Sequence, residues 1–279
     1  MTSTLSKTRK PKAGKMSWAA RFGLAVIALY LFIVLFCSWI APYGQTAIVG
    51  MSMDPWSAEH WLGTDELGRD LLSRLLYAIR NTAVLAFTAN ALAFIVGVSL
   101  GLSAAFKGGW IDNVLSRLVD SVLALPQLIL ALLMLSIFGN STGVLIAVIA
   151  SLDSMRVYRL ARAAGMNIVV LPFVEASRLR GESMIWCILH EILPNVATPL
   201  LAELGIRFCY VFLFISGLSF LGLGLQPPAA DLGSMVKETS GLISFGDFTP
   251  LIPAAAIALI TVSVNLVIDW ILHKNSGLE

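Results

Sequence analysis

The chain has 279 residues, of which 57% are hydrophobic and only 13% are charged. A soluble globular domain carries about 25% charged residues, so the composition excludes that class and indicates a polytopic membrane protein. The formal net charge of +2 says little about partners. Three cysteines lie in or beside apolar segments and three histidines are dispersed, so neither a disulfide framework nor a metal site is predicted.

The N-terminal part of the chain predicts a tail followed by a membrane helix. Residues 1–20 are polar and basic, and we interpret them as a solvated cytoplasmic tail rather than an arm that binds nucleic acid. The apolar run Phe22 to Ala41 has about 20 residues, enough to cross a hydrocarbon core of roughly 30 Å. It is longer than the apolar region of a typical signal peptide and lacks a small-residue cleavage site, so it is predicted to remain uncleaved.

The polar segment after this span contains the run WLGTDELGRDLLSR, from Trp61 to Arg74. This run predicts a turn and then a capped interfacial helix that leads into the next span. Thr64 or Asp65 is expected to accept hydrogen bonds from the free N–H groups at the helix start. Asp70 stands four residues before Arg74, a spacing at which opposite charges pair on a helix.

Five further spans are predicted, at Asn81–Phe106, Val114–Phe138, Thr142–Gly165, Val196–Gly224 and Thr249–Leu272. The span Thr142–Gly165 is the weakest, because its purely apolar run ends at Ala150 and charged residues follow. Pro126 and Pro199 are expected to kink their helices, which a bundle tolerates. Six spans place both termini on one side, and most basic residues lie on that side, so we expect both termini in the cytoplasm.

A polar segment from Pro172 to Pro194 separates the fourth and fifth spans. Its pattern predicts two short helices joined at Gly181, because Pro172 suits a first helical turn and Pro194 is not expected to continue a helix. Apolar residues follow Gly181 at spacings of three and four, as on one face of a helix. The segment is either an ordinary loop packed on its own bundle or a docking element that offers a charged helical surface to a partner protein.

Ionisable residues inside the predicted spans are candidates for function. Glu203 and Arg207 lie about 12 and 18 Å into the fifth span. Either they satisfy each other at a helix interface, or Arg207 faces a translocation path and attracts a substrate carboxylate. Asn265 and Asp269 lie near the end of the last span, where packing or capping is the expected role. The sequence has no phosphate-binding loop, zinc motif or hydrolase motif, so no ATP hydrolysis, metal binding or catalysis is expected.

The segment between Pro172 and Pro194 resembles the EAA loop of ABC-importer permeases, with its Glu-Ala-Ala, later Gly and final Leu-Pro. The matching positions are Glu175, Ala176, Ser177, Gly181, Leu193 and Pro194. Two residues depart from the family pattern, because Ser177 replaces an alanine and Glu191 replaces an apolar residue or a histidine. In the family this loop inserts into a groove of the ATP-hydrolysing subunit and carries its closing motion into the membrane, so the resemblance implies that role here.

Two further stretches resemble one subclass of these permeases, the dipeptide, oligopeptide and nickel importers. The run from Trp61 to Arg74 resembles the subclass signature GTDxxGRDxxSR, and Ser219 to Pro228 resembles SFLGLGxQPP. In relatives the second stretch lies at the outer mouth, where a solute-binding protein docks. The tryptophan that usually follows is absent, and Asp231 stands in that region.

The resemblance implies an all-α membrane bundle of six transmembrane helices, the transmembrane domain of a type I ABC importer, of the C-type permease subunit. Its parts would be a cytoplasmic tail (1–20), a first helix with an extracytoplasmic interfacial segment (21–80), a permease core (81–273) with a cytoplasmic coupling loop (172–195), and a cytoplasmic tail (274–279). The protein would lie in the bacterial inner membrane as half of a translocation pore.

The same resemblance implies partners and a substrate class. A second permease subunit, two cytoplasmic ATPase subunits and an extracytoplasmic solute-binding protein would assemble with this chain, and nucleic acid would not. ATP and Mg would be bound by the ATPase subunits, so this chain would hold no cofactor and catalyse no reaction. Peptides are the expected substrate, and nickel, nickel chelates, glutathione or opines are the alternatives.

Two other classes of membrane protein are the alternatives to an ABC-importer permease. A secondary transporter would show inverted repeats and paired broken helices around a midplane site. A membrane-embedded enzyme would need a catalytic constellation inside the spans, where only Asp153, Glu203 and Arg207 offer themselves without a nucleophile and base.

Overall fold

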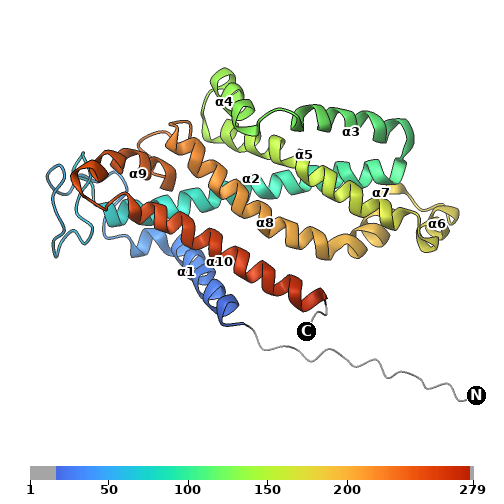
Figure 1. Ribbon diagram of the computed structural model, residues 1–279, viewed down its shortest axis with the longest axis horizontal. Helices are drawn as coiled ribbons and strands as arrows, with labels where there is room; N and C mark the ends of the chain where they lie inside the picture. Colours follow the sequence, from blue (N-terminus) through green and yellow to red (C-terminus); the bar gives the residue numbers. More distant parts are fainter. Residues whose placement is uncertain (1–16, 277–279) are drawn as a thin grey trace, which may run out of the picture.

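The computed structural model describes residues 17–276, which form an elongated bundle of helices (Figure 1). The basic residues of the expected N-terminal tail before Ser17 lie outside the described residues. The helices are α1 (Trp18–Ile40), α2 (Leu71–Lys107), α3 (Gly109–Leu123), α4 (Gln127–Phe138), α5 (Thr142–Val169), α6 (Pro172–Leu179), α7 (Met184–Trp186), α8 (Leu193–Phe220), α9 (Leu232–Thr239) and α10 (Leu251–Ser276). Residues 17–276 contain no strand, only two isolated bridges, so the predicted all-α class is confirmed.

Four helical stretches are by themselves long and apolar enough to cross a membrane: Trp18–Ile40, Leu71–Lys107, Met184–Phe220 and Leu251–Lys274. A fifth candidate is the pair α3 and α4, which is bent by 89°. The remaining predicted span is α5, whose 28-residue helix forms as expected and is long enough to cross a membrane but is less apolar than the other four. Charged residues in its second half account for the difference, so the count of six is only partly confirmed.

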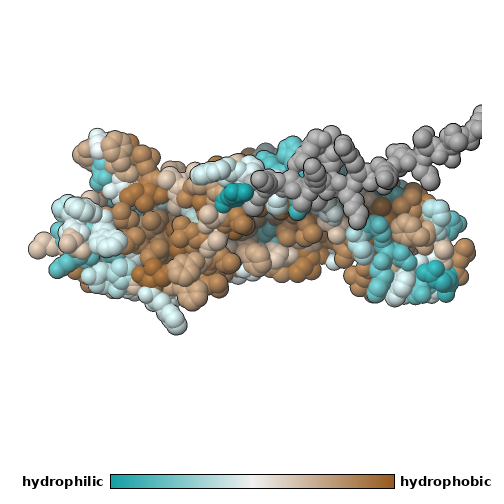
Figure 2. All heavy atoms as spheres, turned by 90° about the horizontal axis from the view of Figure 1, so that it is seen from below, coloured by the Kyte–Doolittle hydropathy of each residue, from teal (hydrophilic) through white to brown (hydrophobic). Residues whose placement is uncertain are grey.

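The surface of the bundle suits lipid rather than water. Large apolar side chains are exposed along several helices, including Leu35 of α1 at 67% and Phe87 of α2 at 67%. Figure 2 shows hydrophobic residues covering the middle of the molecule and hydrophilic residues gathering at both ends. Apolar side chains exposed over such an area would be unfavourable in water and are stabilised in a hydrocarbon core.

A stripe of small residues lets α2 and α5 approach closely. Every fourth residue along α2 is buried and small: Ala89, Ala93, Gly97, Gly101 and Ala105. Residues four apart lie on one helical face, and small side chains there allow two backbones to come together in a membrane. A Cβ atom at Gly101 would lie 2.6 Å from the carbonyl oxygen of Tyr158 on α5. A larger residue at Gly101 would therefore clash with the backbone of α5, and the glycine lets the two helices pack directly against each other.

The two ends of the bundle carry different elements (Figure 1). We call one the α9 end; it holds residues 41–70 and α9, and α1 ends and α10 begins there. We call the other the α6 end, which holds α6 and α7. The chain therefore enters α1 and leaves α10 away from the α9 end, and residues 172–194 lie opposite residues 41–70.

The predicted cap at Thr64 or Asp65 is wrong, because no helix begins there. The helix starts at Leu71, is capped by Asp70, and runs unbroken into the span that was expected from Asn81. Asp70 Oδ2 accepts hydrogen bonds from the backbone N–H of Ser73 at 2.8 Å and from its hydroxyl at 2.6 Å. Asp70 therefore does not pair with the residue four positions on, as the spacing suggested.

Two prolines behave differently from the predictions. Pro126 does more than kink a helix, since it stands between α3 and α4, where the 89° bend falls. Pro194 does not end a helix, because it lies in the first turn of α8 and the chain is helical on both sides. The residues before it, Cys187–Ile192, form a π-helical segment, in which the N–H of Leu193 bonds to the carbonyl of Ile188. A π turn is wider than an α turn and accommodates the proline ring, which has no N–H to satisfy.

Candidate functional site

The first part of the segment predicted to dock a partner folds into the short helix α6, which has a defined end. Pro172 starts α6, and Glu175 lies in its first turn, where a negative charge suits the helix dipole. Gly181 has a φ of +81°, and its N–H donates to the carbonyl oxygen of Arg178 at 3.0 Å. The N–H of Glu182 donates to the carbonyl oxygen of Ser177 at 3.2 Å. This pair of bonds is a Schellman motif, which favours glycine at the position with positive φ.

The two residues that depart from the family pattern contact each other. The hydroxyl of Ser177 lies 2.8 Å from Oε1 of Glu191 and accepts a hydrogen bond from Nη2 of Arg180 at 2.7 Å. Arg180 Nη2 also lies 3.7 Å from Glu191 Oε1. Ser177 and Glu191 thus link α6 to the π-helical segment Cys187–Ile192. The Glu191 carboxylate is therefore paired within the loop.

The loop of residues 172–195 packs against the end of α2. Arg178 donates a hydrogen bond to the carbonyl of Phe106 at 2.9 Å, and its guanidinium carbon lies 4.0 Å from the centre of the Phe106 ring. Val174 and Ile192 are fully buried against α2, α5 and α8. Charge, stacking and apolar burial therefore hold the loop in one orientation relative to the bundle.

The outward face of the loop combines charge with exposed apolar side chains. Glu175 and Ala176 are exposed, and Leu193 and Pro194 are at the start of α8. Three large apolar side chains are also exposed: Leu179 at 82%, Ile185 at 69% and Leu189 at 51%. Of the six residues predicted for docking, Glu175, Ala176 and Ser177 lie in α6, Gly181 lies in the turn that follows it, and Leu193 and Pro194 begin α8. Ser177 is buried, and the other five lie within or beside the exposed surface.

A second polar group lies halfway along the bundle, between α5 and α8. Arg207 Nε donates to Oε1 of Glu203 at 2.6 Å, so the predicted pair forms. Arg207 Nη1 also lies 3.7 Å from Oδ1 of Asp153 on α5. A cavity of about 380 Å³ opens beside these groups. It is lined by Gln127, Asp153, Arg156, Arg207, Tyr210, Val211 and Phe214.

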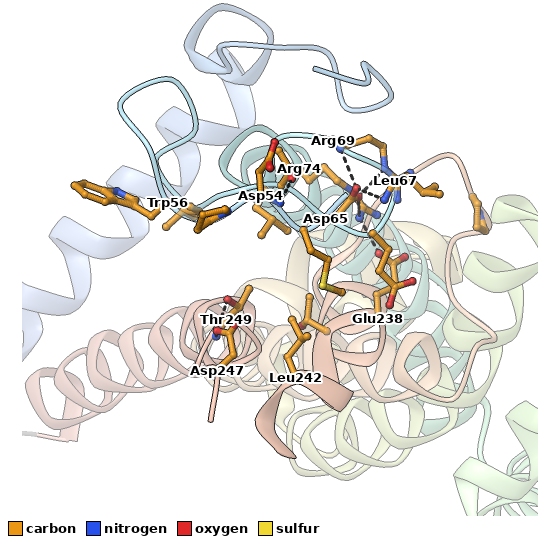
Figure 3. Close-up of a pocket in the computed structure, with 18 of the residues that line it drawn as sticks. Asp54, Trp56, Asp65, Leu67, Arg69, Arg74, Glu238, Leu242, Asp247 and Thr249 are labelled. Carbon is orange, nitrogen blue, oxygen red and sulfur yellow. Dashed lines mark hydrogen bonds and ion pairs between the residues drawn. The ribbon is translucent and has the colours of Figure 1, made fainter. Parts of the chain in front are cut away.

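A third polar group lies at the α9 end, around a cavity of about 530 Å³ (Figure 3). Arg74 is 2% exposed, and its Nη1 donates to Asp65 at 2.6 Å and to Glu238 of α9 at 2.7 Å. Arg69 Nε donates to the same carboxylate of Asp65 at 2.6 Å. The run from Trp61 to Arg74 is thus tied to α9 by a chain of ion pairs, and its arginines are neutralised locally.

The environment of Asp65 determines its charge state. Burial by itself raises the pKa of this carboxyl group. This effect is outweighed by hydrogen bonds from the backbone and side chain of Arg69, by a hydrogen bond from the N–H of Leu67 and by the positive charge of Arg74, so the pKa lies below its usual value. Asp65 is therefore the charged centre of the group.

Sequence reasoning found some of these residues and missed others. It singled out the residues predicted for docking and the pair Glu203 and Arg207. It did not place Gln127 or Arg156 beside that pair, because they lie on other helices and no local spacing connects them. The one usable indication was Asp153, a carboxylate within a predicted span.

Asn265 and Asp269 do not join any of these groups. Asn265 Nδ2 donates to the carbonyl of Thr261 within α10, and both Asn265 and Asp269 are exposed. The local role expected for Asn265 agrees with this bond.

Comparison with known proteins identifies the family. A family model described as "Binding-protein-dependent transport system inner membrane component" matches residues 93–274. The dipeptide transport system permease protein DppC of Alkalihalophilus pseudofirmus is 32% identical over 257 residues, which cover 91% of this chain and 84% of that protein. The di/tripeptide transport system permease protein DppC of Pseudomonas aeruginosa is 35% identical, covering 88% of this chain and 84% of that protein.

A third relative is the dipeptide transport system permease protein DppC of Escherichia coli K12, which is 36% identical over 91% of this chain and 87% of its own length. The family model covers well over half of the chain, and the apolar helices agree with a membrane location. The chain therefore belongs to the inner membrane components of binding-protein-dependent transport systems and is a multi-pass subunit of an ABC importer.

Proposed function

We propose that this chain is one of two permease subunits of an ATP-driven peptide importer and that it receives its driving force through the loop of residues 172–195. The observation that carries the proposal is the geometry of that loop. It is a helical element, joined to α2 by the hydrogen bond of Arg178, with an exposed carboxylate at Glu175 and exposed apolar side chains around it. An apolar patch rimmed by charge is typical of a protein-binding surface.

The partners follow from this surface and from the family. Two cytoplasmic ATPase subunits, which bind ATP and Mg, dock on the α6 end, and the closing of these subunits moves the loop. An extracytoplasmic solute-binding protein delivers substrate at the α9 end. A second permease subunit completes the pore. In this arrangement both termini lie in the cytoplasm, and the arginines of the α9 end are on the outer side.

Peptide is the substrate that the relatives support, because those named above are dipeptide or di/tripeptide permeases. The path for the peptide runs between this chain and the second permease subunit, past Glu203 and Arg207 at half depth. Nucleotide-driven closure opens the path outward, and ATP hydrolysis reverses it.

Cysteine labelling in intact cells tests the orientation and the docking loop together. The natural cysteines Cys37, Cys187 and Cys209 are buried, so an introduced cysteine at an exposed alanine is the preferred target. Ala176→Cys places it on α6, and Ala58→Cys is the matched variant at the opposite end, since both alanines are exposed. A membrane-impermeant maleimide should label Ala58→Cys from outside and Ala176→Cys only after permeabilisation.

The same variants test coupling and substrate. A short bifunctional cross-linker should join Ala176→Cys, but not Ala58→Cys, to an ATPase subunit in isolated membranes. Cells that lack this gene should regain uptake of a radiolabelled dipeptide when the wild-type chain is restored. Labelling of Ala176→Cys from outside would overturn the orientation, a missing cross-link would overturn the docking role, and absent dipeptide uptake would overturn the substrate.

A further inference from the structure

The cavity between α5 and α8 lies at the middle of the bundle. Both helices have 28 residues and are about 42 Å long. Asp153 is about 17 Å from the start of α5, and Arg207 is about 21 Å from the start of α8. Each is thus far from either end of its helix. An ionisable group at that depth in a membrane is costly unless it is paired or faces a polar cavity, and such groups are candidates for function.

The two arginines are held by other residues and point toward the same carboxylate. Glu203 holds Arg207 through its Nε, and Gln127 accepts a hydrogen bond from Nη1 of Arg156. The Nη1 atoms of Arg207 and Arg156 lie 3.7 and 3.9 Å from Oδ1 of Asp153. A charge-assisted hydrogen bond is about 2.7–2.9 Å long, so neither arginine bonds directly to Asp153. Each guanidinium has five N–H donors and keeps some of them for another acceptor.

Asp153 itself lacks a donor. Its side chain is 1% exposed, and its Oδ2 has no hydrogen-bond partner among the described residues. A buried carboxylate oxygen without a donor is unfavourable, because it has lost its hydrogen bonds to water and has no hydrogen bond within the protein to replace them. Asp153 lines the cavity, so a cation or an N–H donor that enters the cavity would supply the missing bond.

A helix break adjoins the same cavity. Gln127 is the first residue of α4, directly after the bend of 89° that separates α4 from α3. The N-terminus of a helix carries partial positive charge, which attracts anionic groups. The break therefore adds a third attraction for an anion beside the two arginines.

From these observations we propose that the cavity binds the two free ends of a short peptide, with the α-carboxylate at Arg156 and Arg207 and the α-ammonium at Oδ2 of Asp153. This inference rests on the proposed import of peptides. The two arginines and two carboxylates in and beside the cavity balance in charge, as do the ends of a zwitterionic peptide. The cavity volume of about 380 Å³ lies within the range of roughly 300–1,000 Å³ found for small-ligand sites.

Uptake by the complete importer in proteoliposomes, with its binding protein, tests the inference. The probes are dialanine, dialanine amide and N-acetyl-dialanine. Because the binding protein is the same in every assay, a changed preference between probes must arise in the membrane chain. Arg207→Gln should reduce the ratio of dialanine to dialanine amide uptake at least tenfold, and Arg207→Lys should restore part of it. Asp153→Asn should reduce the ratio of dialanine to N-acetyl-dialanine uptake in the same way.

A matched control separates recognition from structure. Arg162→Gln removes another ion pair of α5, in which Arg162 Nη2 contacts Asp112 at 2.6 Å, remote from the cavity. It should leave both uptake ratios within twofold of wild type, and all variants should keep ATP hydrolysis that responds to the loaded binding protein.

Two outcomes would overturn the inference, and a third would overturn the proposed function. Unchanged ratios in Arg207→Gln and Asp153→Asn would overturn it while peptide import stands. Recovery of wild-type uptake and ratios in the double variant Asp153→Asn/Arg207→Gln would also overturn it, because the two residues would then be a structural pair. Failure of the wild-type importer to take up any dialanine would instead overturn the proposed function on which it rests.

Discussion

The close contact of α2 with α5 leads to a prediction that can be worked out in atomic terms. Gly97 faces Val157, and a Cβ atom added at Gly97 would lie 2.6 Å from the Cβ of Val157 and 2.7 Å from the carbonyl oxygen of Ser154. Carbon atoms prefer a separation of about 3.5–4.0 Å. Gly97→Ala therefore forces the two helices apart by about 1 Å at this point, since part of the obstacle is backbone that cannot rotate away.

The expected cost follows from this displacement. A radial gap of about 0.5–1 Å forfeits a quarter to a half of the dispersion energy of each contact that it opens. Inserting a methyl group into a packed interface typically costs about 1–3 kcal/mol, and we expect Gly97→Ala to lie in that range. Gly217→Ala is the matched control, because Gly217 is also inside a membrane helix but has no described atom within 4 Å of its added Cβ.

Reversible unfolding in SDS mixed micelles measures both variants. Alanine stabilises an exposed helical position by up to about 1 kcal/mol relative to glycine, so Gly217→Ala should match or exceed the free energy of unfolding of the wild type. Gly97→Ala should fall below it. If Gly97→Ala is as stable as Gly217→Ala, then α2 and α5 can accommodate a methyl group between them. The inference that small residues are needed for the close approach of these helices is then refuted.

Three further predictions concern the α9 end. Arg74→Met leaves Asp65 and Glu238 without their shared cation, so it should cost about 3–5 kcal/mol in the same SDS assay, whereas Arg80→Met, at a partly exposed position, should cost under about 1 kcal/mol. Asp70→Ala removes the cap of α2 and should lower the free energy of unfolding by about 1 kcal/mol, as measured by thermal unfolding. Asp70→Asn should keep most of the stabilisation that the cap provides, because asparagine also caps helices well. The lowered pKa of Asp65 means that its charge stabilises the fold fully above the ordinary value of 3.8 and that this stabilisation is lost as pH falls through the lower folded value. Melting temperatures should therefore fall less on acidification in Asp65→Asn than in the wild type, and equal slopes would contradict the assignment.

The parts of the fold that depend on local pattern were predictable from the sequence. Apolar runs gave the helices that begin at Trp18 and Leu251 to within a few residues. Gly181 was expected between two helical pieces, and the structure gives the reason, since the Schellman motif requires a positive φ there. These features depend on residues that are neighbours along the chain, and local spacing carries that information.

The features that depend on distant residues were not predictable. The cap of α2 is Asp70 rather than Asp65, because Asp65 is taken up by Arg69 and by Arg74. Spacing alone does not decide which of two neighbouring carboxylates a helix uses. The grouping of Asp153 with Arg207 joins two helices, and a hydropathy profile treats such residues only as interruptions of an apolar run. The link from Ser177 to Glu191 likewise appears only when α6 folds back on the π segment.

The length of α2 has a mechanical consequence. Its 37 residues make a rod of about 55 Å, whereas a hydrocarbon core is about 30 Å thick. One tip carries Arg74, which holds α9, and the other tip carries Phe106, on which Arg178 sits. No joint interrupts the rod, so rocking it by about 10° about its midpoint would swing the two tips about 5 Å in opposite directions. A displacement of the α6 end and a displacement of the α9 end are then parts of one rotation, and no relay of intermediate side chains is needed to connect them.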